Sequence, residues 1–178
     1  NKYDFELSLT SRGMLSYLFS FEGFYSVSGI FENNNFYPKL YSQKWKTKKK
    51  NREIIIGFEN KKIKKLEQKP SESEFGRVEY LELEDYVDPL TSFLRLMTGT
   101  NESKTIDGRR VYTLKLFSKS LEKKTSEYFV KDYINIWADH QKNDFKKLLI
   151  VKDDKDLVPD KIVISFKERD FKLEKTNF

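Results

Sequence analysis

The feature that most constrains the fold is an alternation of apolar and polar residues with a period of two. In residues 2–9 every second residue from Tyr3 to Leu9 is apolar, and the residues between them are polar. This period is typical of a β-strand with one buried face and one solvated face. Strand patterns of this kind, or short apolar runs, recur at 24–32, 36–47, 52–59, 62–68, 109–117, 126–139, 144–152, 161–168 and 171–175.

The segments between these strands carry turn signals. Asn33-Asn34-Asn35 favours a turn because asparagine tolerates left-handed backbone, and Asp107-Gly108 is a strong hairpin signal. Neither a βαβ rhythm nor an internal repeat is present. We therefore predict a single domain over residues 1–178 with an all-β, mainly antiparallel fold. We expect a curled sheet in the form of an open β-barrel or β-spiral, with one or two short helices.

The clearest helix signal lies between Asp88 and Gly99. Asp88 suits an N-cap, Pro89 suits the first helical position, and Gly99 suits the C-terminal stop. A second segment, 11–21, is expected to be a short helix or an apolar loop. The stripe of the 88–99 helix should lie on the sheet, and we expect it to plug the core: Leu90, Phe93, Leu94 and Met97.

Basic residues are concentrated in one part of the chain. Residues 44–65 hold ten lysines and arginines against two glutamates, whereas the whole chain has a net charge of +6. The lysines gather at two successive hairpin ends, and such ends lie at opposite edges of an antiparallel sheet. We expect solvated turns; contact with an anionic surface through Lys48, Lys49, Lys50, Lys61 and Lys62 is the alternative. Nucleic acid is disfavoured because lysine greatly outnumbers arginine.

Residues that support common catalytic chemistry are scarce. The chain has no cysteine, which excludes disulfides and thiol catalysis, and its one histidine, His140, lies in a hydrophilic stretch that suggests a surface loop. The acidic run at 153–156 lacks the central glycine and distal glutamate of a calcium loop. No glycine-rich phosphate loop and no window of about 18 apolar residues occurs. We predict no enzyme, no metal, no cofactor and no transmembrane segment.

Aromatic residues make up 15% of the chain and fall on the faces of expected strands. Tyr37, Tyr41 and Trp45 are spaced to share one face of the 36–47 strand. Such a face can stack on sugars or bases, but packing inside a curved sheet is the more ordinary role. Together with the helix stripe, these three residues are our candidates for an apolar ligand site.

Several of these motifs occur together in one known family. The order of DPLTSFLRLM, IDGRRVYTLKL, NIWAD and LVPDKIVISF resembles the bacterial exported domain of unknown function 3108 family. The stretch from Gly13 to Tyr41 is also similar to the middle of that family. Its members usually begin with a further hairpin before the strand at 2–9, so we expect a trimmed N-terminus. The residues that carry the resemblance are Asp88, Pro89, Leu90, Asp107, Gly108, Arg109, Arg110, Tyr112, Trp137 and Pro159.

The resemblance implies a periplasmic protein with an antiparallel sheet curled into an open barrel or spiral, and it supplies no catalytic residues. We expect a non-enzymatic cell-envelope protein that binds a lipidic or acylated ligand, or an envelope partner protein, in the concavity of the sheet. The alternative is a structural or assembly subunit that docks through an edge strand. An enzyme and a polyanion-binding protein are the remaining hypotheses.

Overall fold

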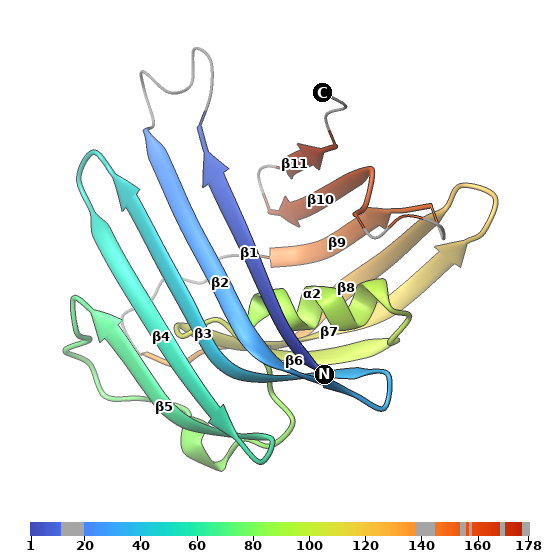
Figure 1. The fold of residues 1–178 in the computed structure, drawn as a ribbon. Coiled ribbons are helices and arrows are strands. Elements are labelled where there is room, and N and C mark those ends of the chain that lie inside the picture. The colour runs from blue at the N-terminus through green and yellow to red at the C-terminus, as the bar shows by residue number, and fades with distance from the viewer. Residues whose placement is uncertain (12–19, 138–144, 154–155, 157, 168–169, 176–178) are drawn as a thin grey trace.

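The computed structural model describes residues 1–11, 20–137, 145–153, 156, 158–167 and 170–175 (Figure 1). Strands make up most of the described chain. It contains one α-helix, α2 (Pro89–Met97), and one 3₁₀ helix, η1 (Tyr80–Glu82). The strands are β1 (Lys2–Thr10), β2 (Phe21–Glu32), β3 (Asn35–Thr47), β4 (Asn51–Glu59), β5 (Lys62–Lys69), β6 (Glu102–Ile106), β7 (Arg110–Ser120), β8 (Thr125–Asn135), β9 (Phe145–Val151), β10 (Lys161–Phe166) and β11 (Asp170–Glu174).

The strands form two antiparallel sheets, with the order β1-β2-β3-β4-β5 in the first and β11-β10-β9-β8-β7-β6 in the second. The all-β, mainly antiparallel class is therefore confirmed. The described strands do not close a barrel, which agrees with the expected curled, open β-fold, and they are divided between two sheets. The ladder is interrupted between β5 and β6, where residues 70–88 supply η1 and only isolated bridges, such as Gly76 to Trp137.

Residues that tolerate left-handed backbone build the hairpin turns. Asn33 and Asn34 connect β2 to β3 with φ values of 49° and 58°, as their sequence predicts. Gly108 connects β6 to β7 with a φ of +87°. A Cβ at this glycine would lie 2.5 Å from the Ile54 side chain, so the turn needs glycine for both its conformation and its space.

A bulge changes the faces of β3. Tyr41 pairs with Val27 and Tyr37 pairs with Ile30, and the register shifts by one residue between them. The two partners lie three residues apart on β2, so they point to opposite faces of the sheet. Tyr41 therefore faces the interior with Val27, and Tyr37 is on the other face. The predicted shared face of Tyr37 and Tyr41 is wrong for this reason.

Helix α2 lies between the two sheets and is tied to both (Figure 1). The Tyr3 hydroxyl from β1 lies 2.9 Å from the Thr91 hydroxyl, and the Thr105 hydroxyl from β6 donates to Ser92 at 2.9 Å. Asp88 caps the helix by accepting from the Thr91 N–H, as predicted. These polar contacts fix the helix as a spacer that prevents the inner faces of the sheets from meeting along their whole length.

The buried apolar residues of the described chain form two clusters, and α2 contributes one residue to each. The first includes Tyr41, Ile54 and Ile56 from the first sheet, with Leu90 at the start of the helix. The second includes Tyr112 and Leu148 from the second sheet, with Leu96 near the end of the helix. The fold therefore has two partial cores joined by the helix, because the two sheets diverge.

Three expectations concern residues that lie wholly or partly outside the described ranges. They are the helix or apolar loop at 11–21, of which 12–19 are not described, the surface loop with His140, and the acidic run at 153–156, of which 154 and 155 are not described.

Candidate functional site

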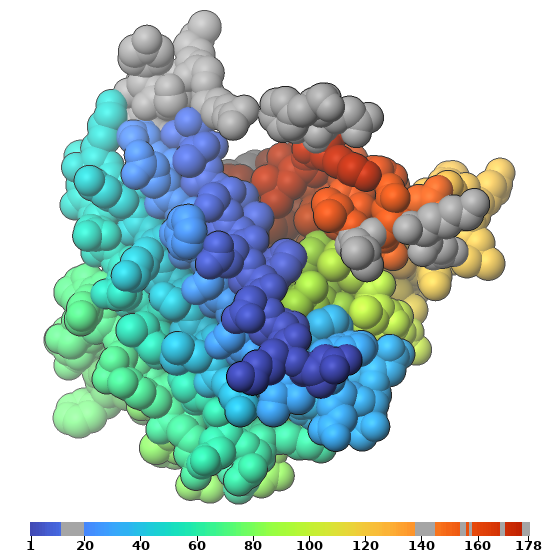
Figure 2. Space-filling view, in the orientation of Figure 1, coloured from blue at the N-terminus to red at the C-terminus, as the bar shows by residue number. Residues whose placement is uncertain are grey.

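A cavity of about 530 Å³ lies between the two sheets, next to α2. We call it the inter-sheet cavity. Figure 2 shows the surface hollowed between β1, in blue, and the red strands β10 and β11. The inner face of β1 contributes Phe5, Leu7 and Leu9, the helix contributes Leu90, Phe93 and Met97, and the second sheet contributes Phe145, Leu148, Ile162 and Ile164.

The lining of this cavity is mostly apolar because the alternating faces of strands from both sheets point into it. If the cavity were closed and empty of water, its 530 Å³ would lower the free energy of unfolding by about 13 kcal/mol, at about 24 cal/mol per Å³. That cost is similar to the whole free energy of unfolding of an ordinary domain, about 5–15 kcal/mol. The cavity must therefore be filled, either by water from its open side or by a ligand with an apolar surface.

Most of the helix residues predicted to bind a ligand do line this cavity. Leu90, Phe93 and Met97 project into it from α2, and Tyr41 reaches it from β3. Leu94 is partly buried but is not part of the lining. The predicted stripe is thus divided: Thr91, Ser92 and Leu96 are buried, whereas Leu90, Phe93 and Met97 line the cavity and Leu94 does not.

Tyr37 and Trp45 lie elsewhere. Tyr37 lines a different cavity of about 660 Å³, where the Arg95 guanidinium lies 5.8 Å from its ring. Arg95 also donates two hydrogen bonds to the carbonyl oxygen of Phe36, at 3.0 and 2.7 Å. Trp45 packs beside Phe21 with 6.5 Å between ring centroids. The three aromatic residues therefore do not form one binding surface.

Two tyrosines, Tyr41 and Tyr112, are among the polar residues that line the inter-sheet cavity. The Tyr41 hydroxyl donates to Gln43 Oε1 at 3.0 Å, and burial raises the pKa values of Tyr41 and Tyr112 well above their ordinary range. Neither phenol ionises at physiological pH. These groups can orient a ligand, but they provide neither a base nor a nucleophile at neutral pH.

Asp88 is a fully buried carboxylic acid at the start of α2, next in the chain to Pro89 and Leu90, which line the cavity. One carboxyl oxygen accepts from the Thr91 N–H at 2.9 Å, and the other has no hydrogen-bond partner among the described residues. Burial raises its pKa from 3.8 to about 6, against the opposing effect of the Thr91 hydrogen bonds. Its capping contact makes it a structural group of the helix start.

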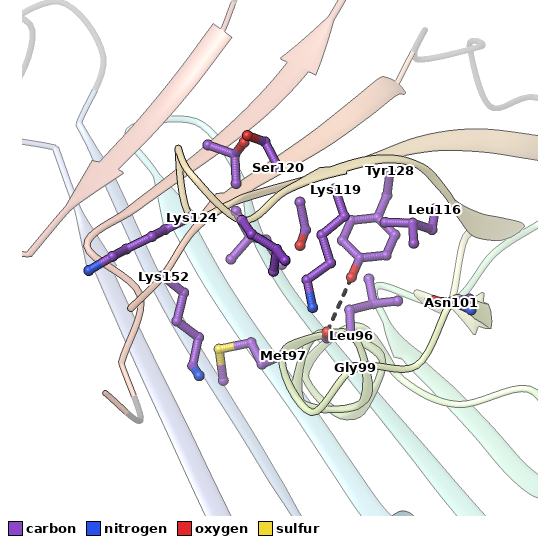
Figure 3. A pocket seen from close by; sticks show the side chains of 14 residues that line it. Leu96, Met97, Gly99, Asn101, Leu116, Lys119, Ser120, Lys124, Tyr128 and Lys152 are labelled. Carbon is purple, nitrogen blue, oxygen red and sulfur yellow. Dashed lines mark hydrogen bonds between the residues drawn. The ribbon is translucent and has the colours of Figure 1, made fainter. Parts of the chain in front are cut away.

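A second, smaller pocket lies at the C-terminal end of α2 (Figure 3). We call it the lysine pocket. Its volume is about 90 Å³, and Lys119, Lys124 and Lys152 line it together with Leu96 and Met97. The Tyr128 hydroxyl crosses it to donate to the Leu96 carbonyl oxygen at 3.2 Å. Met97 also lines the inter-sheet cavity, so the two spaces share this side chain.

The basic residues of 44–65 do not gather into a patch. Lys48, Lys49 and Lys50 follow β3 at one end of the first sheet, and Lys61 and Lys62 start β5 at the other (Figure 1). This separation confirms the expected arrangement of two hairpin ends. Lys62 pairs with Glu84 at 2.7 Å and Lys61 with Asp85 at 3.9 Å, both on the surface.

The sequence analysis missed two groups of site residues. The apolar residues of β1 and β10 were visible as alternation, but nothing in the sequence indicates that their faces oppose each other across a gap. Lys119 lies near the end of β7 and Lys152 directly follows β9, and no local motif marks either residue. The position of both sheets against α2 brings the apolar faces to one site, and the pairing of β8 with both β7 and β9 brings the two lysines to one pocket.

The structure and the known families together give the following classification. In the described part of the chain, no helix is long and apolar enough to cross a membrane, and no three His, Asp or Glu residues gather in a way that would hold a metal. No curated protein and no solved structure matches the chain. The family model described as "Protein of unknown function (DUF3108)" matches residues 1–162, most of the 178-residue chain. The chain therefore belongs to the DUF3108 family.

Proposed function

We propose that this protein binds the hydrocarbon chain of a lipidic or acylated ligand in the inter-sheet cavity. The observation that carries the proposal is the cavity itself, which is about 530 Å³ in volume and mostly apolar in its lining. Ligand sites in proteins commonly have volumes of about 300–1,000 Å³ and apolar linings with few polar groups. The lining comes from both sheets and the helix, so a ligand there would bridge the two halves of the fold.

The chemistry of the lining favours a hydrocarbon chain over a polar metabolite. Phe93 and Met97 form one wall and Leu148 and Ile162 form another, and none of these side chains has a hydrogen-bonding group that would select a polar ligand. A chain with about 12 buried methylenes would gain about 10 kcal/mol at about 0.8 kcal/mol each. Association costs at least about 4 kcal/mol, which leaves about 6 kcal/mol at most, so we expect dissociation constants of tens of micromolar or weaker.

The proposal describes a carrier or sensor and not an enzyme. The tyrosines near the cavity remain protonated at neutral pH, and the chain has no cysteine and a single histidine. The periplasm as location is part of the same proposal and depends on the resemblance to exported bacterial domains. Cell fractionation with antibody detection would test the location separately from the binding.

The test of binding is direct. Purified protein should release a fatty acid or phospholipid when extracted with organic solvent, and after delipidation it should bind a fluorescent long-chain fatty acid with saturable, one-to-one stoichiometry in native mass spectrometry. A shorter eight-carbon probe serves as the control, since it buries fewer methylenes and should bind at least tenfold more weakly. Absence of bound lipid together with no saturable binding of the long chain would refute the proposal.

An edge-strand assembly function is the second candidate, and one observation favours it. Among the described strands, β1 pairs only with β2, in an unbroken register from Lys2 to Thr10. A regular edge of nine residues can accept a strand from a partner protein. Thr10→Pro and Asp4→Pro variants remove edge donors, and loss of a co-purified envelope partner in both would support this function; unchanged recovery would contradict it.

A further inference from the structure

We propose that the lysine pocket binds the anionic headgroup, a carboxylate or phosphate, of the same amphiphile whose chain occupies the inter-sheet cavity. This inference rests on the proposed function and specifies the class of its ligand. It selects fatty acids and anionic lipids over neutral long-chain alcohols and acylglycerols.

The two spaces follow one another along the inner face of the second sheet. On β7, Leu114 lines the inter-sheet cavity and Leu116 lines the lysine pocket; on β9 the corresponding residues are Leu148 and Ile150. Residues two apart on a strand point to the same face and lie about 7 Å from each other. Met97 lines both spaces and is their common wall. A chain in the cavity could thus place its polar end past Met97, in the lysine pocket.

The charges in the pocket are suited to an anion. Lys119 and Lys152 extend toward Leu96 and Met97 at the end of α2, while Lys124 turns away from them (Figure 3). Lys124 forms an ion pair with Asp153. Neither Lys119 nor Lys152 forms an ion pair with another residue that the structure describes. The pocket therefore holds two positive charges that no described carboxylate neutralises.

Lys119 and Lys152 are not needed to cap the C-terminal end of α2, because other donors already form hydrogen bonds with its carbonyl oxygens. The Leu94 carbonyl accepts from the Thr98 N–H, and the Leu96 carbonyl accepts from the Gly99 N–H and the Tyr128 hydroxyl. The Arg95 carbonyl accepts from the Thr100 N–H at 3.1 Å. The C-terminal end of a helix carries about half a negative charge, which opposes an anion. Two ammonium groups outweigh it.

The size of the pocket agrees with a headgroup. Its volume of about 90 Å³ can hold several water molecules or one carboxylate or phosphate, but not a further length of chain comparable to that in the larger cavity. Ser120 and Ser126 also line it and add hydroxyl donors to the two lysines. The combination of small volume, hydroxyls and unpaired ammonium groups is typical of an anion subsite.

The test compares two probes with the same chain, palmitate and hexadecanol, on delipidated full-length protein at pH 8. Each partly exposed ion pair contributes up to about 1 kcal/mol, so wild type should bind palmitate about 5- to 20-fold more tightly than hexadecanol. The Lys119→Gln/Lys152→Gln variant should lose this preference and bind hexadecanol as wild type does. Lys2→Gln/Lys46→Gln, which makes the same change in net charge on the exposed first sheet, should keep the preference.

The outcomes separate this inference from the proposed function. Equal binding of both probes by wild type, or a preference that survives in Lys119→Gln/Lys152→Gln, would overturn the headgroup subsite while leaving chain binding intact. Failure of wild type to bind either probe would refute chain binding itself and the inference with it. Inorganic phosphate that binds wild type as tightly as palmitate would show a site for free anions and would also overturn the inference.

Discussion

A charge placed inside the inter-sheet cavity should prevent ligand binding without unfolding the protein, and Leu7→Glu makes this change. Leu7 lies on the inner face of the edge strand β1, is partly buried and lines the cavity. A bound hydrocarbon chain would cover the new carboxylate and leave it without a partner. Covering such a group costs at least about 2 kcal/mol, so the affinity for palmitate should fall by about 30-fold or more.

The neighbouring residue provides the matched control. Ser8 is exposed on the outer face of the same strand, and Ser8→Glu adds the same charge one position away. This variant should bind palmitate within about twofold of wild type. Leu7→Glu also loses apolar burial of a partly exposed leucine, which should lower the free energy of unfolding by about 1–2 kcal/mol.

Isothermal titration with palmitate gives the affinities, and urea denaturation followed by circular dichroism gives the free energies of unfolding. Both variants must show the wild-type β-sheet spectrum for the comparison to count. A folded Leu7→Glu protein that binds palmitate as tightly as wild type would refute the placement of the chain beside β1. Equal losses in Leu7→Glu and Ser8→Glu would refute the assignment of the two faces.

Three further predictions concern the packing that shapes the cavity. Gly29→Ala would place its Cβ against the Tyr37 backbone carbonyl oxygen and 2.6 Å from the Tyr3 ring, and it should cost roughly 1–3 kcal/mol in urea denaturation. Gly57→Ala, with its nearest neighbour at 3.4 Å, should stay within about 1 kcal/mol of wild type, and equal effects would contradict the close approach at Gly29. Because burial raises the pKa of Asp88 from 3.8 to about 6, the folded state binds this proton more tightly than the unfolded state, and the stabilisation appears as the pH falls through about 6 and is complete only below 3.8. Relative to Asp88→Asn, wild type should therefore gain about 2 kcal/mol between pH 7.5 and 4, and parallel pH profiles would exclude this titration. Thr105→Val removes the 2.9 Å partner of the buried Ser92 hydroxyl and should cost about 1–3 kcal/mol, most of which Ser92→Ala should restore in the double variant; a double variant as unstable as the single one would contradict this.

The sequence was informative wherever structure is local. The alternation in 2–9, the asparagine turn at 33–35 and the Asp107-Gly108 hairpin correspond to β1 and to two observed connections. The Asp88 cap and its helix are also present as predicted. Each of these features depends on side-chain spacing or backbone preference within a few residues, so a single sequence contains the necessary information.

Features that depend on long-range packing could not be predicted in the same way. The bulge beside Pro38 reverses the face of Tyr37, and one extra residue in a strand leaves the alternation on each side of it unchanged. The break between the two sheets lies in the polar 70–88 region, where the sequence does not show which strands would pair across it. Lys119 and Lys152 line one pocket because β8 pairs with both β7 and β9, and this pairing is not visible in the local sequence.

The most direct test of the account uses the methyl group of Met97 as a reporter inside the cavity. The chain has two methionines, Met14 and Met97, so a protein labelled with ¹³C at the methionine methyl groups gives two signals that Met14→Leu assigns. With ¹³C-filtered NMR, unlabelled palmitate should shift the Met97 methyl signal and show nuclear Overhauser contacts from its methylenes to that methyl. Saturating palmitate that leaves the Met97 signal unmoved and without such contacts would contradict binding of the chain between the two sheets.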